Sequence, residues 1–389
     1  MKVGVLGIGK TPHKIQHGKS LKDLAVEAGR KAMNDAGVAP ADVQMLYVGN
    51  VGSVGFNYEN STGLMVAHHL GVVPAGAVRV EAACGTGAWA LHLGCVAIES
   101  GLYDTVMVLG VEKMNDLATV EGTSIIAQAA DSKEEYFSGL TFPSGTALTA
   151  RKYMQTYGVT EEDLAHTSVK NHYYGARNPS AHLRFECTVD EVMKSAKVAD
   201  PLKLYEVCPM TDAASALVLC RPEILESQPN RPQVYITATS MGSGTWYQAS
   251  DTLDDAYNLF ARPVERAYEM AGITADDVDV AEIYNSFAIQ EPLGIEGLGF
   301  AERGEGWKGA ADGSTWLDGK VAINPSGGLL CKGHPLGATG STQAVDVVEQ
   351  LRGTAPEGML RDGAEIGISA CRGGPGSVGA IHIYQRMED

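Results

Sequence analysis

Hydrophobic and polar positions along the chain predict an alternation of strands and helices. Residues 3–8 and 45–48 form short apolar runs of strand length, whereas residues 21–36 carry apolar side chains at helical spacing and are followed by a helix stop signal, Gly37. The same alternation continues with a strand at 78–81, a helix at about 85–98, a strand at 105–109 and a later strand at 216–219. This order favours an α/β fold with a largely parallel sheet covered on both faces.

An internal repeat divides the chain into two similar parts. The segment AGVAPADVQMLYVGN, which starts at Ala36, aligns with AGITADDVDVAEIYN, which starts at Ala271, at one constant offset of 235 residues (271 − 36). At this offset Asn50 meets Asn285. A second pair of segments, GTGAWALHLGCVAIESG and GATGSTQAVDVVEQLRG, follows in the same order, and each opens a helix with small residues. The chain is therefore predicted to consist of two α/β halves, residues 1–230 and 231–389.

A long segment of the first half, at about 112–210, has no counterpart in the second half. It includes KNHYYGARNPSAH, which mixes polar, aromatic and proline residues. A long irregular insertion in a compact α/β protein is more often functional than idle. We expect this segment to be a lid that covers a substrate.

Composition narrows the range of functions. The 389 residues carry 30 Lys and Arg against 47 Asp and Glu, a net charge of −17, which argues against a nucleic-acid partner held by bulk charge. No stretch is long and apolar enough to span a membrane, and the apolar run at the N-terminus is too short for a signal peptide. The seven cysteines contain no CxxC pair, so neither a disulfide framework nor a zinc site is expected. These features predict a cytoplasmic protein without a bound metal.

The letters from Gly4 to Thr11 match the P-loop pattern of nucleotide-binding proteins. A phosphate-binding loop needs a strand before it and a helix after it. Only three residues precede Gly4, and residues 3–8 are themselves the predicted strand. Nucleotide binding is therefore disfavoured.

Cys84, in EAACGTGA, is the first candidate for chemistry. It follows a predicted strand and opens a helix among residues small enough to let a substrate approach. The positive end of a helix dipole lowers the pKa of a thiol and favours a nucleophilic thiolate. A buried structural cysteine fits the same position equally well.

Two more glycine-rich segments carry reactive side chains. His334 lies in NPSGGLLCKGHPLGATG, directly before the helix of the second repeat, where it could act as a base towards Cys84 if the halves are related by a pseudo-twofold axis. Cys371 lies in ACRGGPG, between two C-terminal strands, where Gly373 and its neighbours offer unhindered backbone N–H groups for an oxyanion hole. A surface turn histidine and an ordinary hairpin are the structural alternatives.

Together these segments resemble the thiolase family, in order and over the whole chain. Cys84 stands where the family keeps its acyl-accepting cysteine, His334 in its Gly-His-Pro signature and Cys371 in its Cys-x-Gly signature. Asn285, in YNSFAIQE, falls at the asparagine- or histidine-containing element. The details are most similar to sterol-carrier-protein-type thiolases of bacteria and archaea, acetyl-CoA acetyltransferases among them. The sequence departs from the usual pattern of the family at two places. Gly-Thr-Gly follows Cys84, and Ser-Phe follows Asn285 where Glu-Ala-Phe is usual.

The resemblance implies the thiolase fold, with two similar βαβαβαββ halves in a layered α-β-α-β-α arrangement and a lid inserted in the first half. It also implies an acyltransferase that cleaves a 3-oxoacyl-CoA with coenzyme A, or runs the reverse Claisen condensation, through an acyl group on Cys84. In the family, the enolate oxygen is assigned to His334 and a water held by Asn285, and the tetrahedral adduct to the N–H groups of Cys84 and Gly373. Cys371 handles the proton of the enolate.

Substrate and partners stay open at this point. Acetoacetyl-CoA and a bulkier branched or aryl substrate such as benzoylsuccinyl-CoA are both compatible, and so is a retro-aldolase or a non-catalytic lipid-binding member of the same fold. Coenzyme A is expected as a co-substrate, with no permanently bound cofactor. The resemblance further implies a homodimer or a dimer of dimers, and a possible small partner subunit with an OB-fold and a zinc ribbon.

Overall fold

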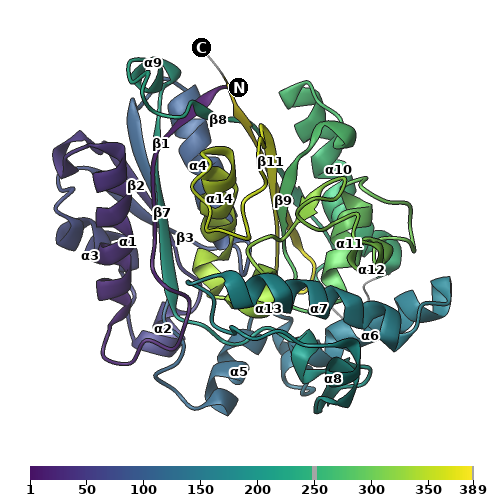
Figure 1. Ribbon diagram of the computed structural model, residues 1–389. Helices are drawn as coiled ribbons and strands as arrows, with labels where there is room; N and C mark the ends of the chain where they lie inside the picture. The colour runs from purple at the N-terminus through teal and green to yellow at the C-terminus, as the bar shows by residue number, and fades with distance from the viewer. Residues whose placement is uncertain (248–251, 388–389) are drawn as a thin grey trace.

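The computed structural model describes residues 1–247 and 252–387. Within these residues, ten strands form one twisted mixed sheet in the order β10-β9-β11-β12-β8-β1-β7-β4-β2-β3 (Figure 1). The bounds are β1 (Val3–Lys10), β2 (Met45–Gly49), β3 (Gly76–Val80), β4 (Thr105–Glu112), β7 (Ala213–Cys220), β8 (Val234–Ser243), β9 (Val280–Ile283), β10 (Ala322–Ile323), β11 (Ile366–Gly373) and β12 (Val378–Arg386).

The strand order is the same in the two halves when it is followed outward from the centre. The first half runs β1-β7-β4-β2-β3 and the second runs β8-β12-β11-β9-β10. The two sets join where β1 pairs with β8 in an antiparallel register, Val3 opposite Ile236 and Gly4 opposite Tyr235. The boundary at residue 230 falls in the connection before β8 and stays a prediction.

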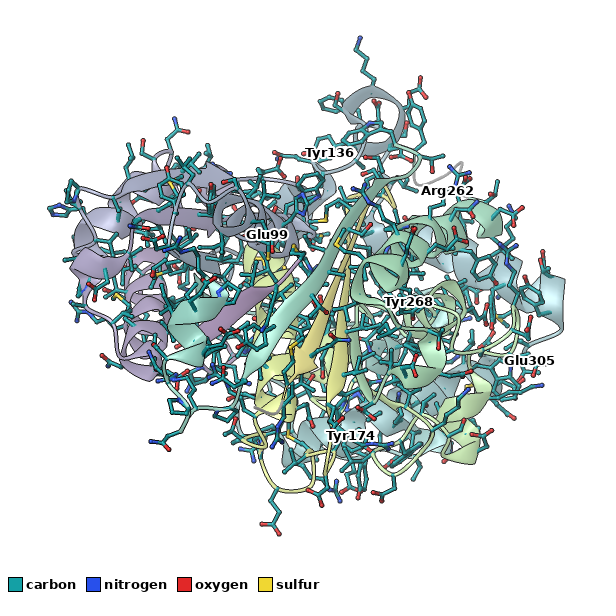
Figure 2. All side chains as sticks on the ribbon, turned by 90° about the horizontal axis from the view of Figure 1, so that it is seen from above. Glu99, Tyr136, Tyr174, Arg262, Tyr268 and Glu305 are labelled. Carbon is teal, nitrogen blue, oxygen red and sulfur yellow. The ribbon has the colours of Figure 1, made fainter. Side chains whose placement is uncertain are left out.

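Helices form three layers, and the two halves of the sheet form the two β layers between them. This gives the α-β-α-β-α arrangement of the thiolase fold. The central layer contains α4 and α14, which pack on each other. Helix α4 lies mainly on β4 and β2 of the first half, α14 lies on β11 of the second half and β7 of the first, and the outer faces are covered by α1 and α10 (Figures 1 and 2). The helices outside the first-half insertion are α1 (Leu21–Ala36), α2 (Ser53–Asn57), α3 (Thr62–Leu70), α4 (Thr86–Glu99), α9 (Pro222–Glu226), α10 (Leu253–Ala271), α11 (Gln290–Gly297), α12 (Lys308–Asp312), α13 (Gly328–Lys332) and α14 (Thr339–Leu351).

The sequence repeat corresponds to a structural repeat. Helix α1 begins with a capping box at Ser20 and ends at Gly37 with φ of 70°, and α10 begins with a capping box at Thr252 and ends at Gly272 with φ of 69°. Both caps satisfy backbone groups that a helix end leaves open. A short 3₁₀ turn and then a strand, β2 or β9, follow each helix.

The P-loop letters belong to a strand. Gly7 and Gly9 lie in β1 directly under α1, where a Cβ atom would come within 2.3 Å of the Ala32 carbonyl oxygen and 2.5 Å of the Ala28 carbonyl oxygen. These glycines therefore allow a strand and a helix to approach closely. No helix among the described residues is long and apolar enough to cross a membrane.

The insertion between β4 and β7 is mostly helical rather than irregular as expected. Its segment KNHYYGAR lies in α7, which begins with a capping box at Thr160 and buries Lys170 and Asn171 against the second half. Burial is tolerated because the Lys170 ammonium lies 2.8 Å from the Glu291 carboxylate. The elements of the insertion are α5 (Thr119–Ala127), a π-helix (Ser132–Tyr136), α6 (Phe142–Tyr157), α7 (Glu161–Arg177), α8 (Val189–Lys194), β5 (Lys197–Ala199) and β6 (Leu202–Lys203).

Candidate active site

Cys84 lies on a tight turn between β3 and α4. The residue before it, Ala83, has φ of 48°, a left-handed conformation that is uncommon for residues other than glycine. The Thr86 hydroxyl braces the turn, because it accepts from the Ala82 N–H at 2.8 Å and donates to the Ala83 carbonyl at 2.5 Å. The Cys84 side chain is consequently held at the start of the central helix.

Burial dominates the state of the Cys84 thiol. The residue is only 5% exposed, and loss of solvation raises the pKa of its thiol to about 11. The neighbouring Tyr284 side chain, the Gly374 backbone N–H and the charge of Arg372 pull the pKa in the other direction. The expected lowering by the helix start is therefore outweighed, and Cys84 rests as a protonated thiol that needs a base.

His334 lies on an extended segment between α13 and α14. Its Nδ1 is 2.7 Å from the Thr339 hydroxyl, which in turn donates to the Pro335 carbonyl at 3.0 Å. Because the hydroxyl proton is used on that carbonyl, the hydroxyl accepts from His334, and we assign the proton of the neutral ring to Nδ1. Burial lowers the pKa of His334 to about 3, so the ring is neutral and Nε2 carries a free lone pair.

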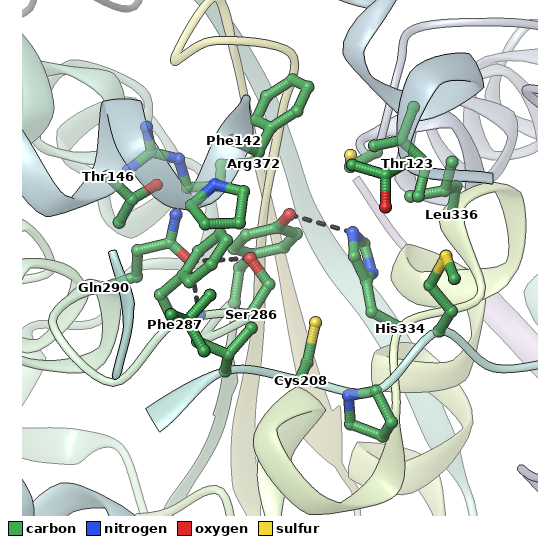
Figure 3. A pocket seen from close by; sticks show the side chains of 18 of the residues that line it. Thr123, Phe142, Thr146, Cys208, Ser286, Phe287, Gln290, His334, Leu336 and Arg372 are labelled. Carbon is green, nitrogen blue, oxygen red and sulfur yellow. Dashed lines mark hydrogen bonds between the residues drawn. The ribbon is translucent and has the colours of Figure 1, made fainter. Parts of the chain in front are cut away.

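Tyr284 links these two side chains and was missed in the sequence. Its hydroxyl lies 3.0 Å from His334 Nε2 (Figure 3), and its side chain packs with Cys84 in one buried cluster beside the pocket, where it lowers the pKa of the Cys84 thiol. The sequence contained a signal for Tyr284. Phe287 can be aligned with the phenylalanine of the usual Asn-Glu-Ala-Phe. This alignment shifts the match by one residue, so that Tyr284 stands where the family has asparagine.

Asn285 points away from the pocket. Its amide nitrogen donates to Asn171 at 3.0 Å and to Glu291 at 2.9 Å, and its amide oxygen accepts from the Leu329 N–H at 2.7 Å. These bonds use both amide hydrogens, and Asn285 does not line the pocket that contains His334, so this geometry does not fit the role expected for Asn285. Asn50, its partner in the sequence repeat, is also buried and forms equivalent hydrogen bonds, so the repeat at this position reflects a structural role.

Cys371 and Gly373 approach the Cys84 turn from β11. Cys371 lies inside this strand, opposite Ala380, and not in the turn after it as expected. Its thiol is 3.5 Å from the Cys84 carbonyl oxygen, and burial raises its pKa. A Cβ atom on Gly373 would come within 2.4 Å of the Gly85 nitrogen, so only glycine lets the strand pass this close.

A pocket of about 470 Å³ opens onto Cys84, Tyr284 and His334. Figure 3 shows His334 and Leu336 on one side of it and Thr146, Gln290 and Arg372 on the other. A third cysteine, Cys208, lies in the wall. Much of the wall is apolar and includes Ile126, Phe142, Pro143, Val207, Met210 and Leu293. A cavity with apolar walls and a few convergent polar groups is typical of a small-molecule site.

The two central helices bring the two halves of the site together. A Cβ atom on Gly340 would lie 2.3 Å from the Ala88 nitrogen, and one on Gly87 would lie 2.8 Å from the Ser341 nitrogen, so the helices cross at two glycines. The buried Glu112 carboxylate of the first half also connects the two halves, since it accepts a hydrogen bond from the Gly337 N–H of the second half at 2.8 Å.

Cys331 and His334 do not face the same site. Cys331 is fully buried, packs in an apolar cluster with Leu330 and Ala288, and does not line the pocket. No group of three or more potential metal ligands occurs in the part of the chain that the structure describes.

Comparison with known proteins identifies the family. Residues 5–223 match "Thiolase, N-terminal domain", and residues 242–386 match "Thiolase C-terminal domain-like". The chain therefore belongs to the thiolase family and is an acyltransferase.

Individual relatives give more detail. An acetyl-CoA acetyltransferase of Methanothermobacter thermautotrophicus is 41% identical over 99% of both chains. The benzoylsuccinyl-CoA thiolase subunit BbsB of Thauera aromatica is 31% identical, over 96% of this chain and 95% of its own length.

Two solved structures share the fold. An Ltp2-ChsH2(DUF35) aldolase superposes with a TM-score of 0.82 at 25% identity, over 98% of this chain and 97% of its own. Human mitochondrial 3-ketoacyl-CoA thiolase in complex with CoA superposes with a TM-score of 0.77 at 17% identity, over 99% and 98%, which supports the fold alone.

Proposed function

We propose that this chain cleaves a 3-oxoacyl-CoA with coenzyme A, and catalyses the reverse Claisen condensation, through an acyl group carried on Cys84. The observation that carries the proposal is that a thiol and a neutral imidazole, Cys84 and His334, line one pocket, while a second thiol, Cys371, lies 3.5 Å from the Cys84 carbonyl oxygen. A thiol nucleophile with a neighbouring neutral base is the arrangement needed for covalent acyl transfer.

The first step is attack of the Cys84 sulfur on the keto carbonyl. The proton of the thiol ends on Nε2 of His334, which is unprotonated because burial keeps the pKa of this ring at about 3. The carbon–carbon bond then breaks, the acyl group stays on Cys84, and the departing fragment is the enolate of an acyl-CoA. Thiolysis by coenzyme A releases the acyl group: the CoA sulfur attacks the acyl carbon, Cys84 leaves and takes back its proton from His334, and the proton of the CoA thiol restores the thiol that protonated the enolate.

Cys371 protonates this enolate. Burial raises the pKa of its thiol, so the side chain is protonated before the bond breaks and can serve as an acid. In the synthetic direction the resulting thiolate would remove the proton from the α-carbon of an acyl-CoA.

Backbone N–H groups stabilise the tetrahedral oxyanion. The N–H groups of Cys84 and Gly373 are the candidates, because β11 lies against the Cys84 turn at Gly373. Removal of one such donor typically costs about 10²–10³ in rate.

The acyl group is the open part of the specificity. Acetoacetyl-CoA and benzoylsuccinyl-CoA, or a related branched or aryl 3-oxoacyl-CoA, are the two candidate substrates, and the apolar wall at Ile126, Phe142 and Leu293 suits the larger one. The acyl group trapped on Cys84 after exposure to a panel of 3-oxoacyl-CoA esters, weighed by mass spectrometry, distinguishes them.

Two variants test the reaction itself. Cys84→Ala should take up no acyl group, whereas Cys371→Ala should still be acylated from acyl-CoA but fail to exchange the α-protons of acetyl-CoA. Wild-type exchange by Cys371→Ala would contradict the role of this thiol.

A retro-aldolase is the second candidate, favoured by the superposition with the Ltp2-ChsH2(DUF35) aldolase. An aldolase reaction releases an aldehyde or ketone and leaves no acyl group on Cys84. Formation of a carbonyl product from a 3-hydroxyacyl-CoA, with Cys84→Ala still active, would replace the thiolase reaction by this one.

We also infer at least a homodimer, and a dimer of dimers as its extension. The edge strand β3 carries the exposed Val78, and the exposed Leu64 and Val73 lie on α3 and the loop before the strand. An open edge with apolar side chains is prone to pair with another strand. The DUF35 component named with the aldolase supports a small OB-fold and zinc-ribbon subunit; co-expression with its genomic neighbour, followed by mass and zinc analysis, tests this.

A further inference from the structure

We propose that the Tyr284 hydroxyl relays the proton from Cys84 to His334, which makes Tyr284 a catalytic residue of this site. The inference rests on the proposed thiolase function, since it concerns how Cys84 is activated for acylation. It replaces a direct transfer from the thiol to the imidazole by a transfer through one phenol oxygen.

The direction of the hydrogen bonds around His334 supports a relay. His334 Nδ1 donates to Thr339, whose own proton is used on the Pro335 carbonyl. Nε2 is therefore an acceptor, and the Tyr284 hydroxyl, 3.0 Å away, must donate to it. The phenol oxygen keeps its lone pairs for the Cys84 thiol, which packs with it in one buried cluster and lines the same pocket.

The surroundings hold Tyr284 in this orientation. Its backbone N–H donates to the Ala370 carbonyl at 2.8 Å, next to Cys371, and its ring stands edge-on to the His334 ring with centroids 5.2 Å apart. The side chain is 5% exposed, so little bulk water competes for the hydroxyl. The titratable groups facing it are His334 and the thiols of Cys84, Cys208 and Cys371.

The step balances without any added reactant. The S–H bond of Cys84 breaks and its proton forms a new O–H bond on Tyr284, while the original phenol proton forms an N–H bond at Nε2 of His334. A thiolate, an intact phenol and an imidazolium result. The electron pair left on sulfur attacks the keto carbonyl, and the reverse relay returns the proton to Cys84 after thiolysis.

The relay also explains how a buried thiolate is stabilised at the moment of attack. The new phenol proton points back at the sulfur, and the Gly374 N–H and the Arg372 charge also favour the thiolate.

Tyr284→Phe tests the relay, because it keeps the ring and removes the hydroxyl. We expect acylation of Cys84 by the substrate acyl-CoA, followed by mass spectrometry in a single turnover, to slow by about 100-fold or more. The KM for the acyl-CoA should change little. Tyr268→Phe is the matched control: its hydroxyl donates to the Leu298 carbonyl in the second half (Tyr268 is labelled in Figure 2), and acylation should stay at the wild-type rate.

Proton counting separates a relay from a structural role and needs no substitution. Two protons move in the relay, so the wild-type acylation rate should fall as a curved function of the deuterium fraction of the solvent. A straight line for the wild-type protein, or acylation by Tyr284→Phe within threefold of the wild-type rate, would overturn the relay.

A separate readout covers failure of the thiolase reaction itself. Alkylation of Cys84 by iodoacetamide requires the thiolate but no acyl-CoA chemistry. Tyr284→Phe should shift its half-maximal pH upward, since the thiolate loses a donor, whereas Tyr268→Phe should not. If no 3-oxoacyl-CoA is cleaved but this shift is present, the relay stands and the proposed function falls. An unchanged half-maximal pH overturns the relay.

Discussion

Strands β2 and β9 are equivalent by the repeat, but they end in different chemistry. Asn50 and Asn285, each just after its strand, have the same structural role. Each donates to a buried glutamate, Glu112 or Glu291, and accepts from a backbone N–H of a short helix, α2 or α13. One position earlier, the first half has Gly49 and the second half has Tyr284. The shared residue maintains the scaffold, and the residue that differs enters the active site.

The two central helices show the same combination of a shared frame and different reactive groups. Both open among small residues and cross at Gly87 and Gly340, yet α4 follows a tight turn with a thiol whereas α14 follows a longer segment with an imidazole. The turn of Cys84 is held by Thr86 alone among side chains of its own helix. The segment of His334 is anchored by Lys332, whose ammonium lies 3.4 Å from Glu282 and contacts Asp346, which also pairs with Lys10 of the first half at 2.7 Å. Duplication thus supplied a symmetric frame for two unlike reactive groups.

Removal of either reactive group should have the largest effect. Cys84→Ala should abolish acylation by acyl-CoA, and His334→Ala should slow it by about 10²–10⁴, since a positioned base contributes that much. Cys95→Ala, in the same helix but buried in an apolar cluster, is the control and should acylate normally. Equal acylation by His334→Ala and the wild-type protein would break the division of labour between the halves.

The pH dependence of Cys84 alkylation should show that the resting pair is neutral. The thiol pKa is raised to about 11, and a raised acid pKa means that the reactive thiolate becomes more abundant as pH rises. The iodoacetamide rate at Cys84 should increase about tenfold per pH unit from about pH 7 to 9.5. A rate that is already constant at pH 7 would instead show a preformed thiolate–imidazolium pair.

Much of this comparison could be read from the sequence. The constant offset predicted two similar halves, and Cys84, His334 and Cys371 are gathered around one site by α4, the segment before α14 and β11. Side-chain direction could not be read in the same way. Asn285 and Tyr284 are neighbours in the sequence, and because successive residues point in different directions, only the structure shows which one enters the pocket.

The helical insertion was hidden for a similar reason. Lys170, Asn171 and His172 look like a solvated loop by composition, but they are buried. The partner of Lys170 and Asn171 is Glu291: it pairs with Lys170 and accepts from Asn171, which lies 120 residues before it in the chain. The pKa of Cys84 was likewise set by burial among distant segments rather than by its own helix.

The equivalent asparagines give a sharper test. Asn285→Ala and Asn50→Ala should each lower the free energy of unfolding by about 1–3 kcal/mol, because each leaves buried groups without a partner. The folded fraction of both variants should keep most of its acylation rate. The result that would restore a role for Asn285 in oxyanion binding is a 100-fold loss of acylation in Asn285→Ala but not in Asn50→Ala, while the two variants have equal free energies of unfolding. Denaturant unfolding and single-turnover acylation measure the two quantities.

The smallest effect is expected at the strained turn. Ala83 holds φ of 48°, which costs an L-residue about 1 kcal/mol or more, and Ala83→Gly removes that strain while it adds freedom to the unfolded chain. These terms oppose each other, so the free energy of unfolding should change by less than about 1 kcal/mol. The Thr86 hydroxyl still braces the backbone on both sides of the turn, and acylation of Cys84 should therefore stay within a few-fold of the wild-type rate. A large loss of acylation at unchanged stability would show that the Ala83 methyl group itself fixes the position of the Cys84 sulfur. The reactive group of the first half would then depend on this turn as strictly as His334 depends on the ion pairs of Lys332.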